Sequence, residues 1–148
     1  MNEMKIRVKK LDPRAVLPVR SSEYAAGADL CALLDAPVTI APGETVFFHT
    51  GLVAEIPEGY AGFVFARSGL STKSGLAPAN KVGVVDSDYR GEWRVALLNH
   101  GSEPVTVEHG QRIAQMVIMP VAAAEFIEAE ELSDTERGEG GFGSTGIN

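Results

Sequence analysis

The chain has 148 residues, 45% of them hydrophobic and 22% charged, which is typical of a single globular domain able to bury its own core. Its formal net charge of −7 argues against general binding to nucleic acid, because an acidic surface repels the phosphate backbone. Cys31 is the only cysteine, which excludes an intramolecular disulfide and a zinc site built on paired cysteines.

The first ten residues alternate charged and apolar positions, so we do not expect a signal peptide. No run approaches the roughly 20 apolar residues that span a bilayer, and we therefore expect a cytoplasmic protein without a membrane partner.

Short segments rich in Val, Ile, Phe and Thr, each bounded by turn residues, predict β-strands along most of the chain. In chain order they cover residues 5–11, 38–40, 45–49, 52–56, 62–66, 82–85, 92–99, 105–108 and 112–121. Residues 68–74 predict one or two helical turns, whereas 122–132 fit a helix or a strand equally well. So many short strands predict an all-β sandwich or barrel.

The composition changes at Ser133, after which polar residues and glycines dominate. Such a segment cannot bury enough apolar surface to fold alone, so we predict a folded domain over residues 1–132 and a flexible arm over 133–148. Phe142 and the Ser144-Thr145 pair are unusual among these glycines and suggest that the arm has a ligand.

The segment 83–92 reads G-V-V-D-S-D-Y-R-G-E and is predicted to form a β-hairpin with two aspartates at its tip. Asp86 and Asp88 have an ordinary structural explanation, because aspartate caps turns by bonding its own backbone. Tyr89, Arg90 and Gly91 follow at once, however, and together they favour a binding site.

The segment 66–70 reads A-R-S-G-L and follows a predicted strand. Ser68 as a helix cap explains it adequately. The functional alternative is a phosphate bound by the Arg67 side chain, the Ser68 hydroxyl and the Gly69 amide, since amides at a helix start favour anions.

Three further segments are weaker signals when taken singly. In 110–116, Arg112 and Gln115 fit a strand with solvent-facing polar residues, and in 26–30 Asp29 fits a turn that leads into a strand. The tail 137–146, R-G-E-G-G-F-G-S-T-G, could wrap phosphates with backbone amides but lacks the Gly-Lys-Ser/Thr of a P-loop.

Taken together and in this order, the five segments resemble the five signature motifs of the dUTPase family, over Ala26 to Gly146. The resemblance implies an all-β, jelly-roll-like fold that assembles as a homotrimer with shared active sites. It also implies hydrolysis of dUTP to dUMP and pyrophosphate with Mg²⁺, a reaction of nucleotide metabolism that keeps uracil out of DNA.

The resemblance assigns roles residue by residue. Asp86 matches the catalytic carboxylate that orients and deprotonates the attacking water. Tyr89 matches the ring that lies against the deoxyribose and leaves no room for a 2′-hydroxyl. Asn80 and the backbone around Gly83 match the hairpin that reads the uracil edge, and Asp29 matches a position that reaches the metal through water.

The remaining matched positions contact the phosphates or belong to the arm. They are Arg67, Ser68, Gly69 and Gln115 in the domain, and Arg137, Phe142, Gly143, Ser144 and Thr145 in the arm. Phe142 matches the residue that stacks over uracil, and in many family members the arm closes over a neighbouring subunit's site. Ligand contact and structural ion pairing remain equally open for Arg90 and Arg112, and the three histidines, His49, His100 and His109, are assigned no chemistry.

Two other functions remain as alternatives. A dCTP deaminase has the same broad fold but needs a glutamate base beside the pyrimidine and a different segment after the arginine-serine pair. A non-catalytic jelly-roll module would need neither Asp86 nor Phe142 in these settings.

Overall fold

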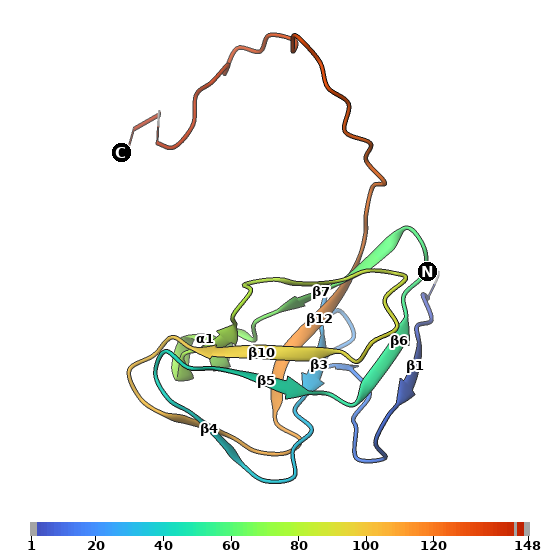
Figure 1. The fold of residues 1–148 in the computed structure, drawn as a ribbon, viewed down its shortest axis with the longest axis vertical. Helices are drawn as coiled ribbons and strands as arrows, with labels where there is room; N and C mark the ends of the chain where they lie inside the picture. Colours follow the sequence, from blue (N-terminus) through green and yellow to red (C-terminus); the bar gives the residue numbers. More distant parts are fainter. Residues whose placement is uncertain (1–2, 144, 147–148) are drawn as a thin grey trace.

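The computed structural model describes residues 3–143 and 145–146, and it is almost entirely β-structure (Figure 1). One helix lies within the described residues, α1 (Ser68–Ser74). The strands are β1 (Arg7–Lys10), β2 (Val19–Arg20), β3 (Ala28–Cys31), β4 (Val38–Ile40), β5 (Thr45–His49), β6 (Leu52–Glu55), β7 (Tyr60–Phe65), β8 (Leu76–Pro78), β9 (Gly83–Val85), β10 (Arg94–Asn99), β11 (Val105–Val107) and β12 (Arg112–Pro120). The predicted all-β, jelly-roll-like class is confirmed.

The strands pair antiparallel in a five-stranded sheet (β2-β3-β12-β7-β9), a three-stranded sheet (β5-β10-β8) and two strand pairs (β1-β6, β11-β4). The core lies between these sheets. Leu30 and Ile113 enter it from the five-stranded sheet, and Phe48 and Leu97 from the three-stranded sheet, each at most 1% exposed. Burying a side chain of this size stabilises the fold by about 1.5–3 kcal/mol.

Strand β12 is the centre of the five-stranded sheet, because it pairs with β3 on one side and β7 on the other. In this register Gln115 lies between Asp29 and Phe65. A β-bulge between Arg112 and Ala114 inserts Ile113, so that both Ile113 and Ala114 are buried. The sheet thereby brings three motifs that are distant in sequence, 26–30, 66–70 and 110–116, to one edge of the fold.

The structure adds strands that the sequence pattern does not reveal. β2 has only two residues, and β8 contains Pro78, which is tolerated because β8 is an edge strand. β3 agrees with the expected turn into a strand at 26–30.

The helix and strand alternatives for residues 122–132 are both wrong, since the structure has neither there. The Val121 amide donates to the Gly59 carbonyl at 2.9 Å, and no hydrogen bond joins the described residues after Val121 to the rest of the chain. Figure 1 shows the arm leaving β12 and arching away from the sheets. A segment without an apolar stripe or a strand edge beside it has nothing to stabilise regular structure.

None of the helical structure in the described part of the chain is long and apolar enough to cross a membrane.

Candidate active site

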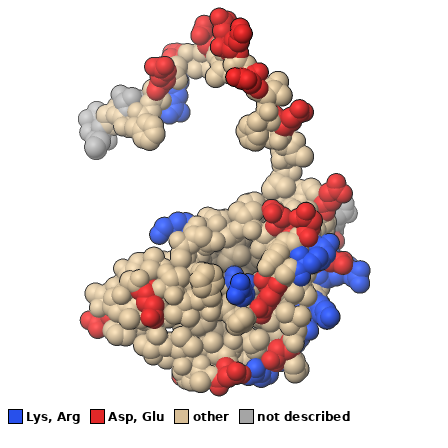
Figure 2. All heavy atoms as spheres, viewed as in Figure 1, with Lys and Arg blue, Asp and Glu red and all other residues tan. Residues whose placement is uncertain are grey.

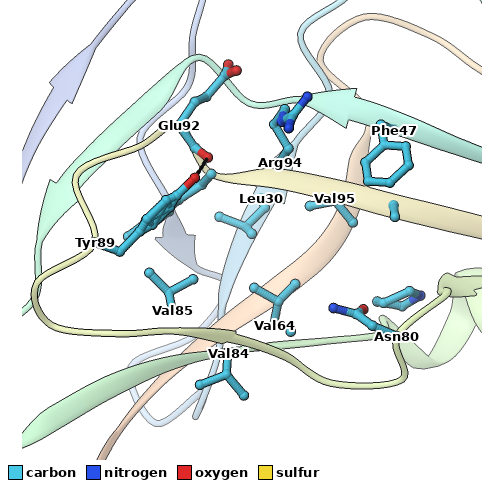
Figure 3. Close-up of a pocket in the computed structure, with 14 residues that line it drawn as sticks. Leu30, Phe47, Val64, Asn80, Val84, Val85, Tyr89, Glu92, Arg94 and Val95 are labelled. Carbon is cyan, nitrogen blue, oxygen red and sulfur yellow. Dashed lines mark hydrogen bonds between the residues drawn. The ribbon is translucent and has the colours of Figure 1, made fainter.

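A cavity of about 310 Å³ lies between β9 and β10 (Figure 3). Its walls are largely apolar, with Leu30, Val64 and Val85 among them, and a few polar side chains face it, including Asn80 and Tyr89. An apolar pocket with a small number of polar groups is typical of a small-molecule site. Three of the predicted site residues, Asn80, Gly83 and Tyr89, therefore meet here.

The loop that carries Asp86 is not the predicted hairpin. β9 pairs with β7, whereas β10 pairs with β5 and β8, so the loop connects two different sheets. Asp86 follows the cavity-lining Val85 directly, and its side chain is exposed to solvent. A turn closes after it, in which the Tyr89 amide donates to the Asp86 carbonyl at 3.1 Å. This arrangement places a carboxylate at the end of a strand that lines the cavity.

The Tyr89 ring is fixed by two features of its own loop. Its hydroxyl donates to the Glu92 carbonyl at 2.9 Å. The ring packs so closely on Gly91 that any Cβ at that position would overlap the phenol. Glycine at position 91 is therefore needed for space.

Asn80 lies in a tight turn between β8 and β9. The Lys81 amide donates to the Pro78 carbonyl at 3.0 Å, and Lys81 has a φ of 69°, unusual for a residue with a side chain. A Cβ on Gly83 would lie 3.2 Å from Val64 Cβ and 3.4 Å from the Asn80 amide nitrogen. Glycine at 83 thus keeps the wall beside Asn80 open.

Asp29, Arg67 and Arg112 form an ion-pair cluster. Arg67 Nε lies 3.0 Å from Asp29 Oδ1, and Arg112 Nη1 lies 3.4 Å from Asp29 Oδ2. The Asp29 side chain is only 14% exposed, so the pairing is partly protected from solvent. Asp29 thus orients two arginines. For Arg112, where ligand contact and structural ion pairing were both open, the structure shows an ion pair.

Gln115 lies at the same end of the five-stranded sheet, beside Asp29. Its Nε2 donates to the Ala66 carbonyl at 2.9 Å, next to Arg67. A Cβ on Gly27 would collide with the Gln115 side chain, which explains a glycine in the 26–30 motif. Two residues after Asp29 on β3, burial raises the pKa of the Cys31 thiol and the Asp29 charge raises it further, so this thiol is a poor nucleophile.

The Ser68 cap interpretation is wrong, because α1 begins with Arg67 as its N-cap, in an extended conformation and without a side-chain cap among the described residues. Ser68 and Gly69 are exposed, and a Cβ on Gly69 would meet open space. Their polar groups are therefore available to a ligand.

The described residues of the arm do not line the cavity of their own chain. Phe142 is completely exposed, and Arg137 Nε donates to the nearby Gly140 carbonyl at 2.7 Å. Gly143 and Thr145 lie in the same exposed stretch, and the predicted residue Ser144 lies outside the described residues. Figure 2 shows acidic side chains gathered along this arm, in keeping with the glutamates and aspartates of residues 125–139.

Sequence reasoning missed Glu92, Phe47 and Arg94, which also line the cavity. Arg94 lies over the Phe47 ring, 5.8 Å from its centroid. Glu92 contacts His49, a residue with no predicted partner. Only the pairing of β5 with β10 brings these residues together, so no short-range pattern reports them.

Comparison with known proteins gives one consistent result. The family model described as dUTPase matches residues 14–146. A deoxyuridine 5′-triphosphate nucleotidohydrolase from Desulfitobacterium hafniense (strain DSM 10664 / DCB-2) is 53% identical over 150 residues, covering 99% of this chain and 99% of the relative. The enzyme of the same name from Nautilia profundicola is 51% identical, covering 97% of this chain and 99% of the relative.

Solved structures agree. A variant of the Staphylococcus bacteriophage 80alpha dUTPase with dUpNHpp superposes with a TM-score of 0.86 at 30% identity, covering 97% of this chain and 99% of the phage chain. A variant dUTPase from phage phi11 of S. aureus, described with a structural Mg(II) ion, gives 0.78 at 25% identity, covering 86% and 98%. The motifs, the fold and the near-complete relatives lead to one conclusion: this chain belongs to the dUTPase family.

Proposed function

We propose that this chain hydrolyses dUTP to dUMP and pyrophosphate at the cavity between β9 and β10, as a step of nucleotide metabolism. Membership of the family makes the chain a hydrolase that acts on a nucleoside triphosphate. The observation that carries the proposal is the convergence of Asn80, Gly83 and Tyr89 on one cavity, with Asp86 at the end of the strand that lines it.

Asp86 is the general base of this reaction. Its exposed carboxylate accepts a proton from one water, whose oxygen attacks the α-phosphorus in line. The new bond forms as the bond from this phosphorus to the α–β bridging oxygen breaks, and pyrophosphate leaves.

Tyr89 and the Asn80 turn select the nucleoside. The ring excludes a 2′-hydroxyl, while Asn80 and the backbone at Gly83 hydrogen-bond the uracil edge. A site shaped for these groups leaves polar atoms unpaired when cytosine binds, which is strongly discriminating.

Arg67, Ser68, Gly69 and Gln115 bind the phosphates. Arg67 belongs to the ion-pair cluster with Asp29, and Gln115 donates to the carbonyl of Ala66, the residue before Arg67. One end of the sheet therefore supplies a cation and several donors. Donors oriented in advance lose little freedom when the triphosphate binds.

Mg²⁺ fits this site as an ion carried by the substrate. Among the described residues no cluster of three His, Cys, Asp or Glu could chelate a metal directly, and both Asp29 oxygens already accept from arginines. Mg²⁺ usually keeps several waters and binds through substrate phosphates and few carboxylates, so Asp29 would reach it through water. Bound there, the ion would neutralise charge on the phosphate oxygens.

Residues 133–148 form the arm that closes over the site, with Phe142 stacked on uracil and Arg137, Gly143, Ser144 and Thr145 at the terminal phosphates. The described arm residues make no hydrogen bond to their own domain, which supports closure over a neighbouring subunit in a homotrimer.

A specificity panel tests the function. Purified protein is incubated with dUTP, dCTP, dTTP or UTP, with Mg²⁺ or with EDTA, and pyrophosphate release and the separated nucleotides are measured. We expect dUTP with Mg²⁺ to exceed every other condition by about 100-fold or more, as expected for a site that pairs buried polar groups with one base. Conversion of dCTP to dUTP would favour the deaminase, and absence of all turnover at micromolar protein would favour a binding module.

Replacing Asp29 with Asn tests its role as the partner of Arg67. We expect kcat/KM for dUTP to fall about 10- to 100-fold, because misplacing a substrate-positioning group by about 1 Å costs up to about 100-fold. Asp12→Asn is the matched control, since Asp12 also forms an ion pair, with Arg14 at 3.0 Å, and neither residue has a role in the proposed reaction. Equal activities of the two variants would exclude the role.

A further inference from the structure

Among the residues that the structure describes, Glu92 is the one acidic residue that lines the cavity, yet it has no role in the proposed reaction. Figure 3 shows its carboxylate pointing away from the cavity, while its main-chain carbonyl meets the Tyr89 hydroxyl. We propose that Glu92 is a positioning residue that fixes the Tyr89 ring and thereby sets discrimination between deoxyribose and ribose. The inference rests on the proposed function, which supplies the contact of the ring with the sugar.

The Glu92 carboxylate clamps the loop to the turn between β5 and β6. Its Oε2 accepts from the Gly51 amide at 2.9 Å, and its Oε1 lies 2.6 Å from His49 Nδ1. The Glu92 side chain is 19% exposed, whereas His49 is 59% exposed, so the amide contact is the better protected of the two. Hydrogen bonds to a charged acceptor are stronger than those between neutral groups.

The turn that receives this carboxylate is rigid. Gly51 has a φ of 71°, and a Cβ there would approach Ala15 Cβ and Leu33 Cδ2 to 2.9 Å. The Gly51 carbonyl in turn accepts from the Leu11 amide at 2.8 Å. Glu92 is thus bound to a closely packed point of the scaffold.

The residue after Glu92 is fixed to the same turn. The Trp93 amide donates to the Leu52 carbonyl at 2.8 Å, and the buried Thr50 hydroxyl donates to the Trp93 carbonyl at 2.5 Å. The carbonyl that receives the Tyr89 hydroxyl therefore lies between two anchors, the Glu92 side chain and the Trp93 main chain. Without the side-chain anchor, this peptide unit is held only through the Trp93 amide, so the loop on its Tyr89 side loosens and the ring is positioned less firmly.

Loss of the Glu92 anchor should affect recognition of the sugar more than recognition of the base. The uracil-reading turn at Asn80 belongs to the β8–β9 connection and has its own hydrogen bonds. A ring that shifts away from the sugar opens space for a 2′-hydroxyl and leaves the base contacts intact. Loss of Glu92 should therefore relax rejection of UTP, and dCTP should still be refused.

The test compares Glu92→Ala and Glu92→Gln in the full-length chain, with kcat and KM measured for dUTP, UTP and dCTP. For Glu92→Ala we expect the ratio of kcat/KM for UTP to that for dUTP to rise about 10-fold, the scale on which pockets distinguish one small group. Glutamine keeps an acceptor for the Gly51 amide, so Glu92→Gln should restore a ratio within about threefold of wild type, by the usual spread of such effects.

Asp12→Ala is the matched control for general destabilisation, since Asp12 also accepts from a main-chain amide, that of Arg14, through a partly buried carboxylate. It should lower Tm without changing the ratio. Tyr89→Phe removes only the hydroxyl and should also raise the ratio of kcat/KM for UTP to that for dUTP. This variant gives a decisive measurement even where Glu92→Ala does not fold.

An unchanged ratio in Glu92→Ala, or in Tyr89→Phe where the alanine variant is unfolded, would overturn the positioning role while dUTP hydrolysis by the wild type stands. A wild type that hydrolyses no dUTP would overturn the proposed function, and this inference with it. A Glu92→Ala variant that accepts dCTP as readily as UTP would also contradict the inference.

Discussion

Asp86→Asn should lower kcat for dUTP by about 1,000-fold, within the 10²–10⁴-fold range that general-base catalysis contributes. Asparagine keeps the size of the side chain and the turn that follows it, in which the main-chain carbonyl of residue 86 accepts from the Tyr89 amide. It cannot take a proton from water. Nucleotide binding should therefore persist, and the dissociation constant for dUTP, measured by calorimetry, should stay within about threefold of wild type.

Asp88→Asn is the control for this substitution, because Asp88 is an exposed aspartate of the same loop. It removes the same charge two residues further on and should leave kcat nearly unchanged. Wild-type kcat in Asp86→Asn would exclude Asp86 as the base, and an equal loss in both variants would indicate a general effect of charge in the loop.

Local pattern predicted much of the fold. The structure has a strand that overlaps each of the nine predicted ranges, because alternation of apolar and polar residues reports which face of a strand is buried, as in β10. The predicted helical turns coincide with α1. The strands that escaped, β2 and β8, are too short or contain proline, so they have almost no pattern of their own.

Pairing between distant segments could not be predicted in the same way. The hairpin predicted for residues 83–92 followed from sequence proximity, whereas β9 pairs with β7, and β10 pairs with β5 and β8. The same limit hid the contact of His49 with Glu92, which depends on the pairing of β5 with β10. Asn80 and Tyr89 were identified from motif resemblance, and their shared cavity became visible only in three dimensions.

Deleting residues 137–148 should lower kcat/KM for dUTP by about 100-fold and leave a folded oligomer. The described residues of this segment make no hydrogen bond to their own domain, and Phe142 is completely exposed. Tm should therefore move by no more than about 2 °C, as expected for changes of about 0.5 kcal/mol in a domain of this size. The activity falls because closure excludes water and completes the site.

Co-expression of this truncated chain with full-length Asp86→Asn tests which subunit the arm serves. Each chain alone should be nearly inactive, one without an arm and the other without a base. If the arm closes over a neighbouring site, mixed oligomers contain intact bases covered by intact arms, and activity should return to a measurable fraction of wild type. Mass spectrometry would first show that the oligomers are mixed. If their activity does not exceed the summed activities of the two variants measured separately, each arm closes over its own domain. Loss of the folded oligomer on truncation would instead make the arm a structural element.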